Sequence, residues 1–272
     1  MLLLAPLALA QTPAWRYDLA VQRFVDGQAE AVAESGNLLE DWLSGRISAP
    51  KALEKLKVRE EAVLAYQDKL SRAPFHKSLV GYRMAALARS KAHLQALKRI
   101  ATFLQAGKSD RASVQVFSHE LNRILSLAQL DWLSARQQWL PRLSPGGPAG
   151  YYAWQARILP IQRREAELSG RLQQLVYQGN TKEPDLGLLA REGEKLTREV
   201  SKLRKEAGAV KGGAAHKAYL GELEALQRVA EAIALMGQDP SPDSLSRLRR
   251  VSRVLLQESR SAQQAALKEL ES

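Results

Sequence analysis

Histidines are few in this sequence, and they are the first side chains to consider as acids, bases or metal ligands. Four occur, and two of them share one pattern: His76-Lys77-Ser78-Leu79-Val80-Gly81 and His216-Lys217-Ala218-Tyr219-Leu220-Gly221. A matched pair of histidines could form two related metal or proton-linked sites. Such sites need further ligands, and no histidine or carboxylate lies at ligand spacing near either one. We therefore interpret both histidines as helix-start residues and predict no metal site; His93 and His119 stand alone and are interpreted in the same way.

Other catalytic signatures are also missing from the sequence. The chain has no cysteine, which excludes disulfides, thiolate nucleophiles, Cys-based zinc sites and thioether-linked haem. It contains no H-E-x-x-H zinc motif, no Glu-x-x-His pair of the di-iron type, no G-x-S-x-G nucleophile motif and no phosphate- or dinucleotide-binding glycine loop. Carboxylates alternate with basic residues, as in Glu194 and Arg198, which is typical of a solvated helix face. We expect no catalytic residue, no cofactor and no enzymatic activity.

Basic residues form two clusters. The chain has 40 Lys and Arg against 29 Asp and Glu, a net charge of +11, and no acidic residue lies between Asp68 and Asp110. The candidate anion-binding residues are Lys77, Lys91, Lys98, Arg99, Arg247, Arg249, Arg250 and Arg253. They suit an anionic polymer, an anionic membrane surface or an acidic protein. The alternative is a solvated face whose charges pair with acids on neighbouring helices. Nucleic acid is not indicated, because exposed aromatic residues do not interleave with either cluster.

Aromatic residues gather around a stretch rich in proline and glycine, residues 141–150. A ligand pocket at this joint would be lined by Trp139, Tyr151, Tyr152 and Trp154. Pockets favour interfaces between domains, which supports this hypothesis. The alternative is that these large side chains seal the ends of helical cores.

The elements that would position these residues are helices. Apolar residues make up 45% of the chain and are mainly Leu and Ala, whereas runs rich in Val, Ile, Thr and Tyr are missing. Apolar periodicity predicts helices over about 15–43, 50–73, 75–106, 110–140, 151–176, 186 to before Gly212, 214–236 and from 243 onwards. Gly45 suits a helix end, and Ser109 or Asp110 suits a helix start. The fold class is therefore predicted to be all-α.

The order of sequence markers repeats in the two halves of the chain. Both halves contain the same features in the same order: a Gly-to-Pro turn, a series of regularly spaced leucines, the His-Lys pair and a second glycine turn. The series of Leu53, Leu56, Val63 and Leu70 matches Leu186, Leu189, Leu196 and Leu203 at one offset. We predict an internal duplication, with antiparallel four-helix units over 11–140 and 151–272 joined by a linker over 141–150.

The N-terminus carries a localisation signal. Residues 1–10 form a short apolar run that ends in Ala8-Leu9-Ala10, which is typical of a secretory signal peptide cleaved after Ala10. The usual basic segment is missing, so we expect the true start of the signal peptide to lie upstream. No later segment is apolar over the length that spans a bilayer. The expected location is the periplasm or the exterior.

Together these features predict a non-enzymatic, extracytoplasmic helical-bundle protein. It would act by binding or scaffolding an anionic envelope component or an acidic partner. One alternative is a bundle that binds a small ligand in a pocket at the joint between its units. A second alternative, if the N-terminal interpretation fails, is a cytoplasmic protein associated with nucleic acid.

Overall fold

The structure is a computed structural model that describes residues 13–72 and 77–272. Within these ranges the chain forms eight α-helices and one short 3-10 helix, without a strand. The α-helices are α1 (Ala14–Leu43), α2 (Ala49–Arg72), α3 (Val80–Ala106), α4 (Arg111–Leu143), α5 (Ala149–Gly179), α6 (Leu186–Gly208), α7 (Ala214–Gln238) and α8 (Pro242–Glu271). The 3-10 helix, Lys77–Leu79, leads directly into α3. The all-α prediction is confirmed. The expected signal peptide, the side chain of Lys77 and all of His76 lie outside the described residues.

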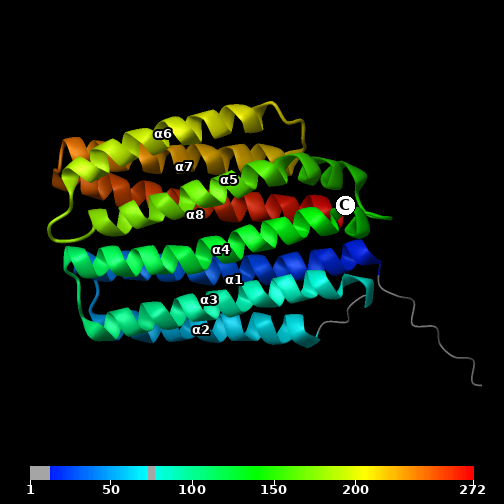
Figure 1. Ribbon diagram of the computed structural model, residues 1–272, viewed down its shortest axis with the longest axis horizontal. Helices are drawn as coiled ribbons and strands as arrows, with labels where there is room; N and C mark the ends of the chain where they lie inside the picture. Colours follow the sequence, from blue (N-terminus) through cyan, green and yellow to red (C-terminus); the bar gives the residue numbers. More distant parts are fainter. Residues whose placement is uncertain (1–12, 73–76) are drawn as a thin grey trace, which may run out of the picture.

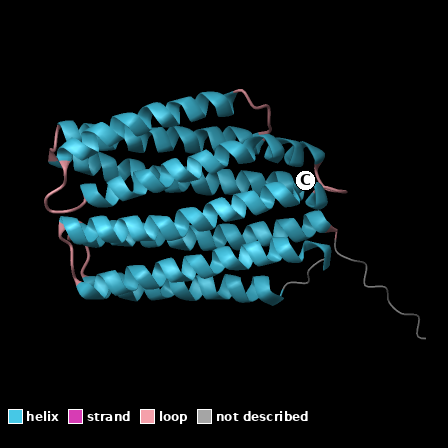
Figure 2. Ribbon diagram, viewed as in Figure 1, coloured by secondary structure: helices cyan, strands magenta, loops and turns pink. Residues whose placement is uncertain are grey.

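The helices run side by side with their long axes roughly aligned, and consecutive helices pack against each other (Figure 1). Helices α1 to α4 form the lower half of the view and α5 to α8 the upper half. The halves meet where α4 packs on α5 and α1 packs on α8. Short loops join α1 to α2 and the successive helices from α3 to α8 (Figure 2), as is usual in antiparallel bundles.

Several helix ends follow from individual residues. Asp110, the residue before α4, accepts a hydrogen bond from the backbone N–H of Ser113 at 2.9 Å, so the expected cap is confirmed. Asp185 caps α6 in the same way through the N–H of Leu188 at 3.0 Å. Gly107 ends α3 with a φ of 66°, a left-handed conformation that glycine adopts without a steric cost.

The connection between the two halves is shorter than the predicted linker. Helix α4 continues to Leu143, and α5 already begins at Ala149. Leu143 is completely buried and holds the last turn of α4 in the core, which keeps Pro141 inside the helix. Only residues 144–148 connect the halves.

One hydrophobic core crosses from one half to the other. Its buried residues come from all eight described α-helices, including Val21 of α1, Leu140 of α4, Ile158 of α5 and Ile233 of α7. A second core cluster lies within the first half and takes only Tyr177 from the other. The two predicted units therefore share a core. The matched positions Val63 and Leu196 are both fully buried, but the duplication itself stays a prediction.

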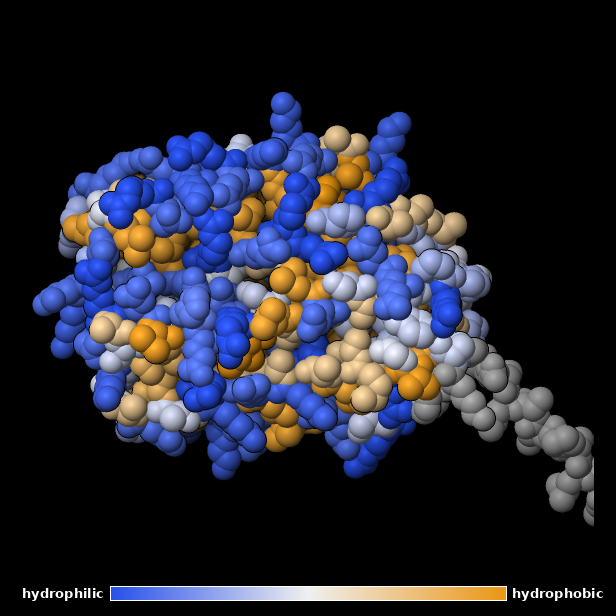
Figure 3. Space-filling model, viewed as in Figure 1, coloured by the Kyte–Doolittle hydropathy of each residue, from blue (hydrophilic) through white to orange (hydrophobic). Residues whose placement is uncertain are grey.

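The outer surface seen in Figure 3 is largely hydrophilic, with smaller apolar areas between charged side chains. Within the described residues, no helix combines the length and apolar character that crossing a bilayer requires. This agrees with the absence of a transmembrane segment predicted from the sequence.

Close approach of α6 and α7 provides a test of this packing. A Cβ added to Gly193 would lie 2.5 Å from the backbone nitrogen of Ala234, where nothing can move aside easily. We expect Gly193→Ala to lower the free energy of unfolding by about 1–3 kcal/mol in urea denaturation, because the helices must separate. The matched control is Gly208→Ala on the same helix, where a Cβ meets nothing within 4 Å and stability should stay equal or rise. Equal stability of the two variants would contradict the packing.

Candidate functional site

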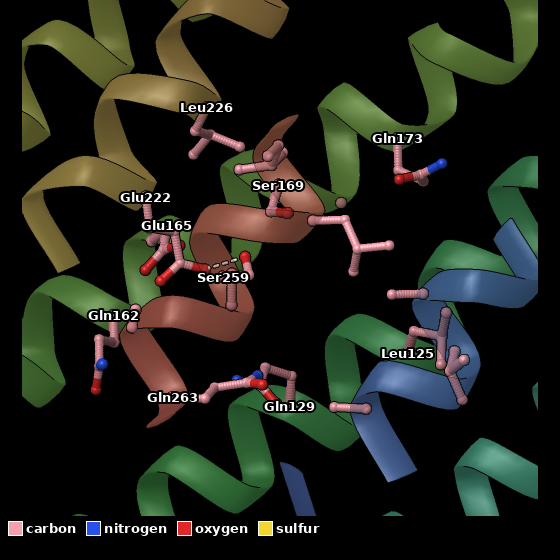
Figure 4. A pocket seen from close by; sticks show the side chains of 18 of the residues that line it. Leu125, Gln129, Gln162, Glu165, Ser169, Gln173, Glu222, Leu226, Ser259 and Gln263 are labelled. Atoms are coloured by element: carbon pink, nitrogen blue, oxygen red, sulfur yellow. Dashed lines mark hydrogen bonds between the residues drawn. The ribbon is translucent and has the colours of Figure 1, made fainter. Parts of the chain in front are cut away.

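A cavity of about 430 Å³ lies between the two halves of the bundle. Its lining residues come from α1, α3, α4, α5, α7 and α8, whereas the outer helices α2 and α6 contribute none of the described lining residues. Small-molecule pockets in proteins commonly measure roughly 300–1,000 Å³. The cavity therefore has the size of a ligand site. Figure 4 shows its central part, with side chains from α4, α5, α7 and α8 converging on it.

The lining of this cavity is unusually polar for the inside of a helical bundle. It includes seven glutamines: Gln22, Gln129, Gln155, Gln162, Gln173, Gln174 and Gln263. It also includes five carboxylates, Asp26, Glu30, Glu40, Glu165 and Glu222, and three arginines, Arg89, Arg136 and Arg260. Apolar surface is contributed among others by Leu125, Trp132, Leu226 and Leu255. Amides, charges and apolar patches together are typical of a specific polar-ligand site.

One end of the cavity is closed by a hydrogen-bond network around Asp18. The Asp18 carboxylate is completely buried and accepts hydrogen bonds from Gln22 at 3.1 Å, from Tyr152 at 3.0 Å and from the Tyr82 hydroxyl. Arg136 of α4 approaches the same carboxylate at 3.5 Å and forms a buried ion pair with it. The network ties α1, α3, α4 and α5 together at this end.

The network also changes the acidity of its tyrosines. Burial raises the pKa of Tyr82 and of Tyr152 above the usual value, and the negative charge of Asp18 raises both further. Burial raises the pKa of Tyr151 to about 12, although Arg136 opposes this. All three hydroxyls are therefore protonated donors at neutral pH.

The four aromatic residues predicted at the joint divide into two groups. Tyr151 and Trp154 line the cavity, and Tyr151 accepts a hydrogen bond from Arg136 at 3.3 Å. Tyr152 belongs to the Asp18 network but is not a lining residue, and Trp139 lies outside, half-buried, with Arg142 over its ring. The structure thus places a cavity at the joint, but only partly where the sequence suggested.

Of the two matched histidines, the structure describes His216. His216 lies in the first turn of α7 and is buried. Its Nδ1 accepts a hydrogen bond from the indole N–H of Trp154 at 3.3 Å. This is the packing role expected for a helix-start residue.

The candidate anion-binding residues are not brought into one site. Lys91 and Lys98 are exposed on α3, but neighbouring Arg99 pairs with Glu120 at 3.0 Å. On α8, Arg247 and Arg250 are exposed, Arg253 pairs with Asp41 at 3.4 Å, and Arg249 donates a hydrogen bond to Asn180 at 3.1 Å. Helix α3 belongs to the lower half in Figure 1 and α8 to the upper half. The two clusters form separate surfaces, and binding of an anionic partner stays a prediction.

A layer of ionisable groups crosses the middle of the cavity. On the side of the first half, Arg89 of α3 is buried and its Nε has no hydrogen-bond partner. Burial lowers the pKa of Arg89 to about 10, and the negative charge of Asp26 opposes this. Burial raises the pKa of Asp26 to about 6, and Arg89 opposes that. Burial also places the pKa of the neighbouring His93 well below its usual value, so this imidazole is neutral.

On the side of the second half, two carboxylates face each other. Glu165 of α5 and Glu222 of α7 point into the same space, and Ser259 of α8 donates a hydrogen bond to Glu222 (Figure 4). Burial raises the pKa of Glu165 well above its usual value, and the charge of Glu222 raises it further. Burial raises the pKa of Glu222 to about 6. A pair of this kind holds a proton at neutral pH unless a cation lies beside it.

Sequence reasoning did not identify this ionisable layer, but α5 carries a signal for the polar lining of the cavity. Gln155, Gln162, Ser169 and Gln173 recur at intervals of seven, seven and four residues, which places them on one helix face. The apolar residues Leu168 and Leu172 recur on the adjacent face. A polar stripe beside an apolar one, on a helix expected to be central, is a sign of an internal polar cavity.

Comparison of this chain with protein-family models, with curated proteins and with solved structures gives no match. Within the described residues, no group of three or more histidines, aspartates and glutamates is arranged to hold a metal ion. The function must therefore be argued from the cavity itself.

The buried Asp18–Arg136 pair gives a first prediction for the site. Replacing Asp18 by Asn leaves the Arg136 guanidinium buried without its anion, and we expect a loss of about 3–5 kcal/mol of stability. Urea denaturation measures this loss. The matched control is Arg23→Gln on the same helix, which removes an exposed pair with Glu271 and should cost about 1 kcal/mol or less. Equal effects of the two substitutions would exclude a structural role for the network.

The raised pKa of Glu222 gives a second prediction. The pKa of Glu222 is 4.5 in the unfolded chain and about 6 in the folded protein, so protonation of Glu222 stabilises the folded state. This stabilisation is complete below pH 4.5 and is lost as the pH rises through about 6. The pKa change from 4.5 to about 6 corresponds to about 2 kcal/mol. Relative to the wild type, Glu222→Gln should therefore gain about that much stability between pH 4.5 and 7.5. The control Glu167→Gln, exposed on α5, should show no such pH dependence.

Proposed function

We propose that this protein binds a small polar molecule in the cavity between its two halves. The observation that supports this most directly is a set of buried polar atoms that line the cavity and have no hydrogen-bond partner within the described residues. They are Arg89 Nε, His93 Nδ1, Gln129 Oε1, Arg136 Nε and Gln155 Oε1. Such atoms are rare in folded proteins and mark places where a further molecule belongs.

Energetics support a ligand with several polar groups. Each buried polar atom without a partner costs roughly 1–3 kcal/mol, and a molecule that supplies the missing donors or acceptors recovers this cost. Apolar lining residues such as Trp132 and Leu226 would cover the carbon skeleton of the same molecule. Because hydrogen-bonding sites discriminate strongly against analogues without the matching groups, this lining favours specific recognition.

The side of the cavity formed by α8 offers a route of entry. Only Ser244, Leu248, Ala262 and Leu270 are buried among the described residues of α8. Its cavity-lining residues Ser252, Leu255 and Ser259 are half-exposed, so they contact both the cavity and the outside. A ligand could therefore reach the cavity along α8 without unfolding of the bundle.

The proposal contains binding and no catalytic step, and it corresponds to a ligand-binding bundle with its pocket at the joint. The extracytoplasmic location remains an independent prediction, because residues 1–10 lie outside the described part. The exposed Lys91 and Lys98 of α3 belong to another surface and play no part in this cavity.

Filling the cavity tests the proposal. Ser169 of α5 points into the cavity (Figure 4), and we expect Ser169→Trp to occupy the space that a ligand needs. Native mass spectrometry of the purified protein should detect a bound small molecule in the wild type and none in this variant. Fluorescence of Trp132 and Trp154, which line the cavity, should respond to added ligands in the wild type alone.

The matched control is Ser261→Trp, an exposed position on α8, which should bind as the wild type does. Circular dichroism and thermal unfolding establish that both variants are folded. If Ser169→Trp does not fold, the smaller Ser169→Leu takes its place. A panel of neutral, cationic and anionic metabolites that leaves wild-type fluorescence and thermal stability unchanged, together with no bound molecule in the mass spectrum, would contradict the proposal.

A further inference from the structure

The charges that line the cavity do not balance. Arg136 is paired with Asp18, and Arg260 is paired with Glu30 at 2.8 Å and with Glu34. Four lining carboxylates then remain outside any ion pair among the described residues: Asp26, Glu40, Glu165 and Glu222. A single lining arginine, Arg89, remains to face them. The lining groups that remain outside ion pairs are therefore predominantly acidic.

The excess of negative charge is concentrated at Glu165 and Glu222. The charged group that acts on Glu165 is Glu222 itself. The groups that act on Glu222 are Asp26 of α1 and Glu258 of α8, which are both carboxylates. No lysine or arginine is among the groups that perturb either residue within the described chain.

Two basic residues of the helices around the cavity act on other groups. Arg164 of α5 forms an ion pair with Glu206 of α6. Arg89 of α3 acts on Asp26 on the far side of the layer. The two facing carboxylates thus provide hydrogen-bond acceptors, and neither forms an ion pair with a lysine or arginine of the described residues.

Two further buried atoms point to a ligand that donates hydrogen bonds. Gln155 is 3% exposed and lines the cavity, and its carbonyl oxygen Oε1, an acceptor, has no partner. Gln129 Oε1 of α4 is the second such acceptor. These acceptor atoms need hydrogen-bond donors. An ammonium group carries three N–H donors.

We infer that the ligand of this cavity is a small organic cation whose ammonium group lies between Glu165 and Glu222. This inference rests on the proposed function and specifies the chemical class of its ligand. An organic cation suits the site better than a metal ion, because no three candidate metal ligands converge within the described residues. The glutamines and the apolar residues of the lining would hold the rest of the molecule.

Calorimetric titration with two amines tests this inference. The probes are 1,4-diaminobutane and butylamine, and the matched uncharged and anionic probes are 1,4-butanediol and succinate. At pH 7.5 the wild type should bind an amine and neither of the matched probes. Glu165→Gln and Glu222→Gln should each weaken binding of that amine at least about tenfold, because each removes a charge that contacts the ammonium group.

Exposed Glu167 provides the matched control, two residues from Glu165 on the same helix. Glu167→Gln changes the net charge of the protein equally but should leave the affinity unchanged. Amine affinity should also fall when the pH is lowered from 7.5 to 5.5, since protons compete for Glu222, whose pKa is about 6. Glutamine is nearly isosteric with glutamate, and thermal unfolding verifies that the variants are folded.

The outcomes separate this inference from the proposed function. Binding of an amine that is weakened equally in Glu167→Gln and Glu165→Gln reflects the overall charge and overturns the inference. Binding of neutral or anionic molecules that Ser169→Trp abolishes, without binding of either amine, also overturns it but leaves the proposed function standing. If neither the amines nor the metabolite panel binds, and the purified protein carries no small molecule, both fail.

Discussion

The buried carboxylate of Asp18, with its partner Arg136, is the group on which one end of the joint between the halves depends. It links α1 to α4, and the hydroxyls of Tyr82 and Tyr152 bring α3 and α5 to the same carboxylate. Removing two charges from water is costly, and the cost is offset only where geometry and further hydrogen bonds are good. This network satisfies the carboxylate with four partners. It therefore fixes how four helices approach one another, and the cavity begins where the network ends.

At the opposite end the cavity closes in a different way. Glu40 of α1 accepts a weak hydrogen bond from Gln173 of α5 at 3.4 Å, and burial raises the pKa of Glu40 to about 7. Across the joint, Tyr151 and Tyr152 of α5 therefore bond to the Asp18–Arg136 pair at one end, and Gln173 of α5 bonds to a partly protonated carboxylate at the other. Between them the inner helices carry polar side chains that do not pack to close the space. The outer helices α2 and α6 keep apolar inner faces, which leaves the overall fold stable around a polar centre.

The helices could be predicted from the sequence because their apolar residues recur with helical periodicity, as Leu189, Leu196 and Leu203 do on α6. Of the large aromatic residues near Pro148 that the sequence singles out, Tyr151 and Trp154 line the cavity, and a ligand pocket at the joint stays a prediction. The layer with Glu165 and Glu222 could not be predicted. The sequence of a helix does not show whether a glutamate faces the interior or the solvent, because this depends on how the neighbouring helices pack. Arg89 lies in the stretch between Asp68 and Asp110 that has no acidic residue, and the packing of α1 against α3 buries it.

The cavity between the halves has a mechanical consequence. Protein interiors are usually packed as densely as organic crystals, so internal space of about 430 Å³ makes the folded state bulkier than its atoms require. Unfolding eliminates internal void volume, and pressure therefore favours the unfolded chain more strongly for such a protein than for a solid bundle. Compression would act first on the loosely filled joint, while α6 and α7, whose backbones touch at Gly193 and Gly237, have no room to approach further. The joint between the halves should therefore be more compressible than the contact between α6 and α7.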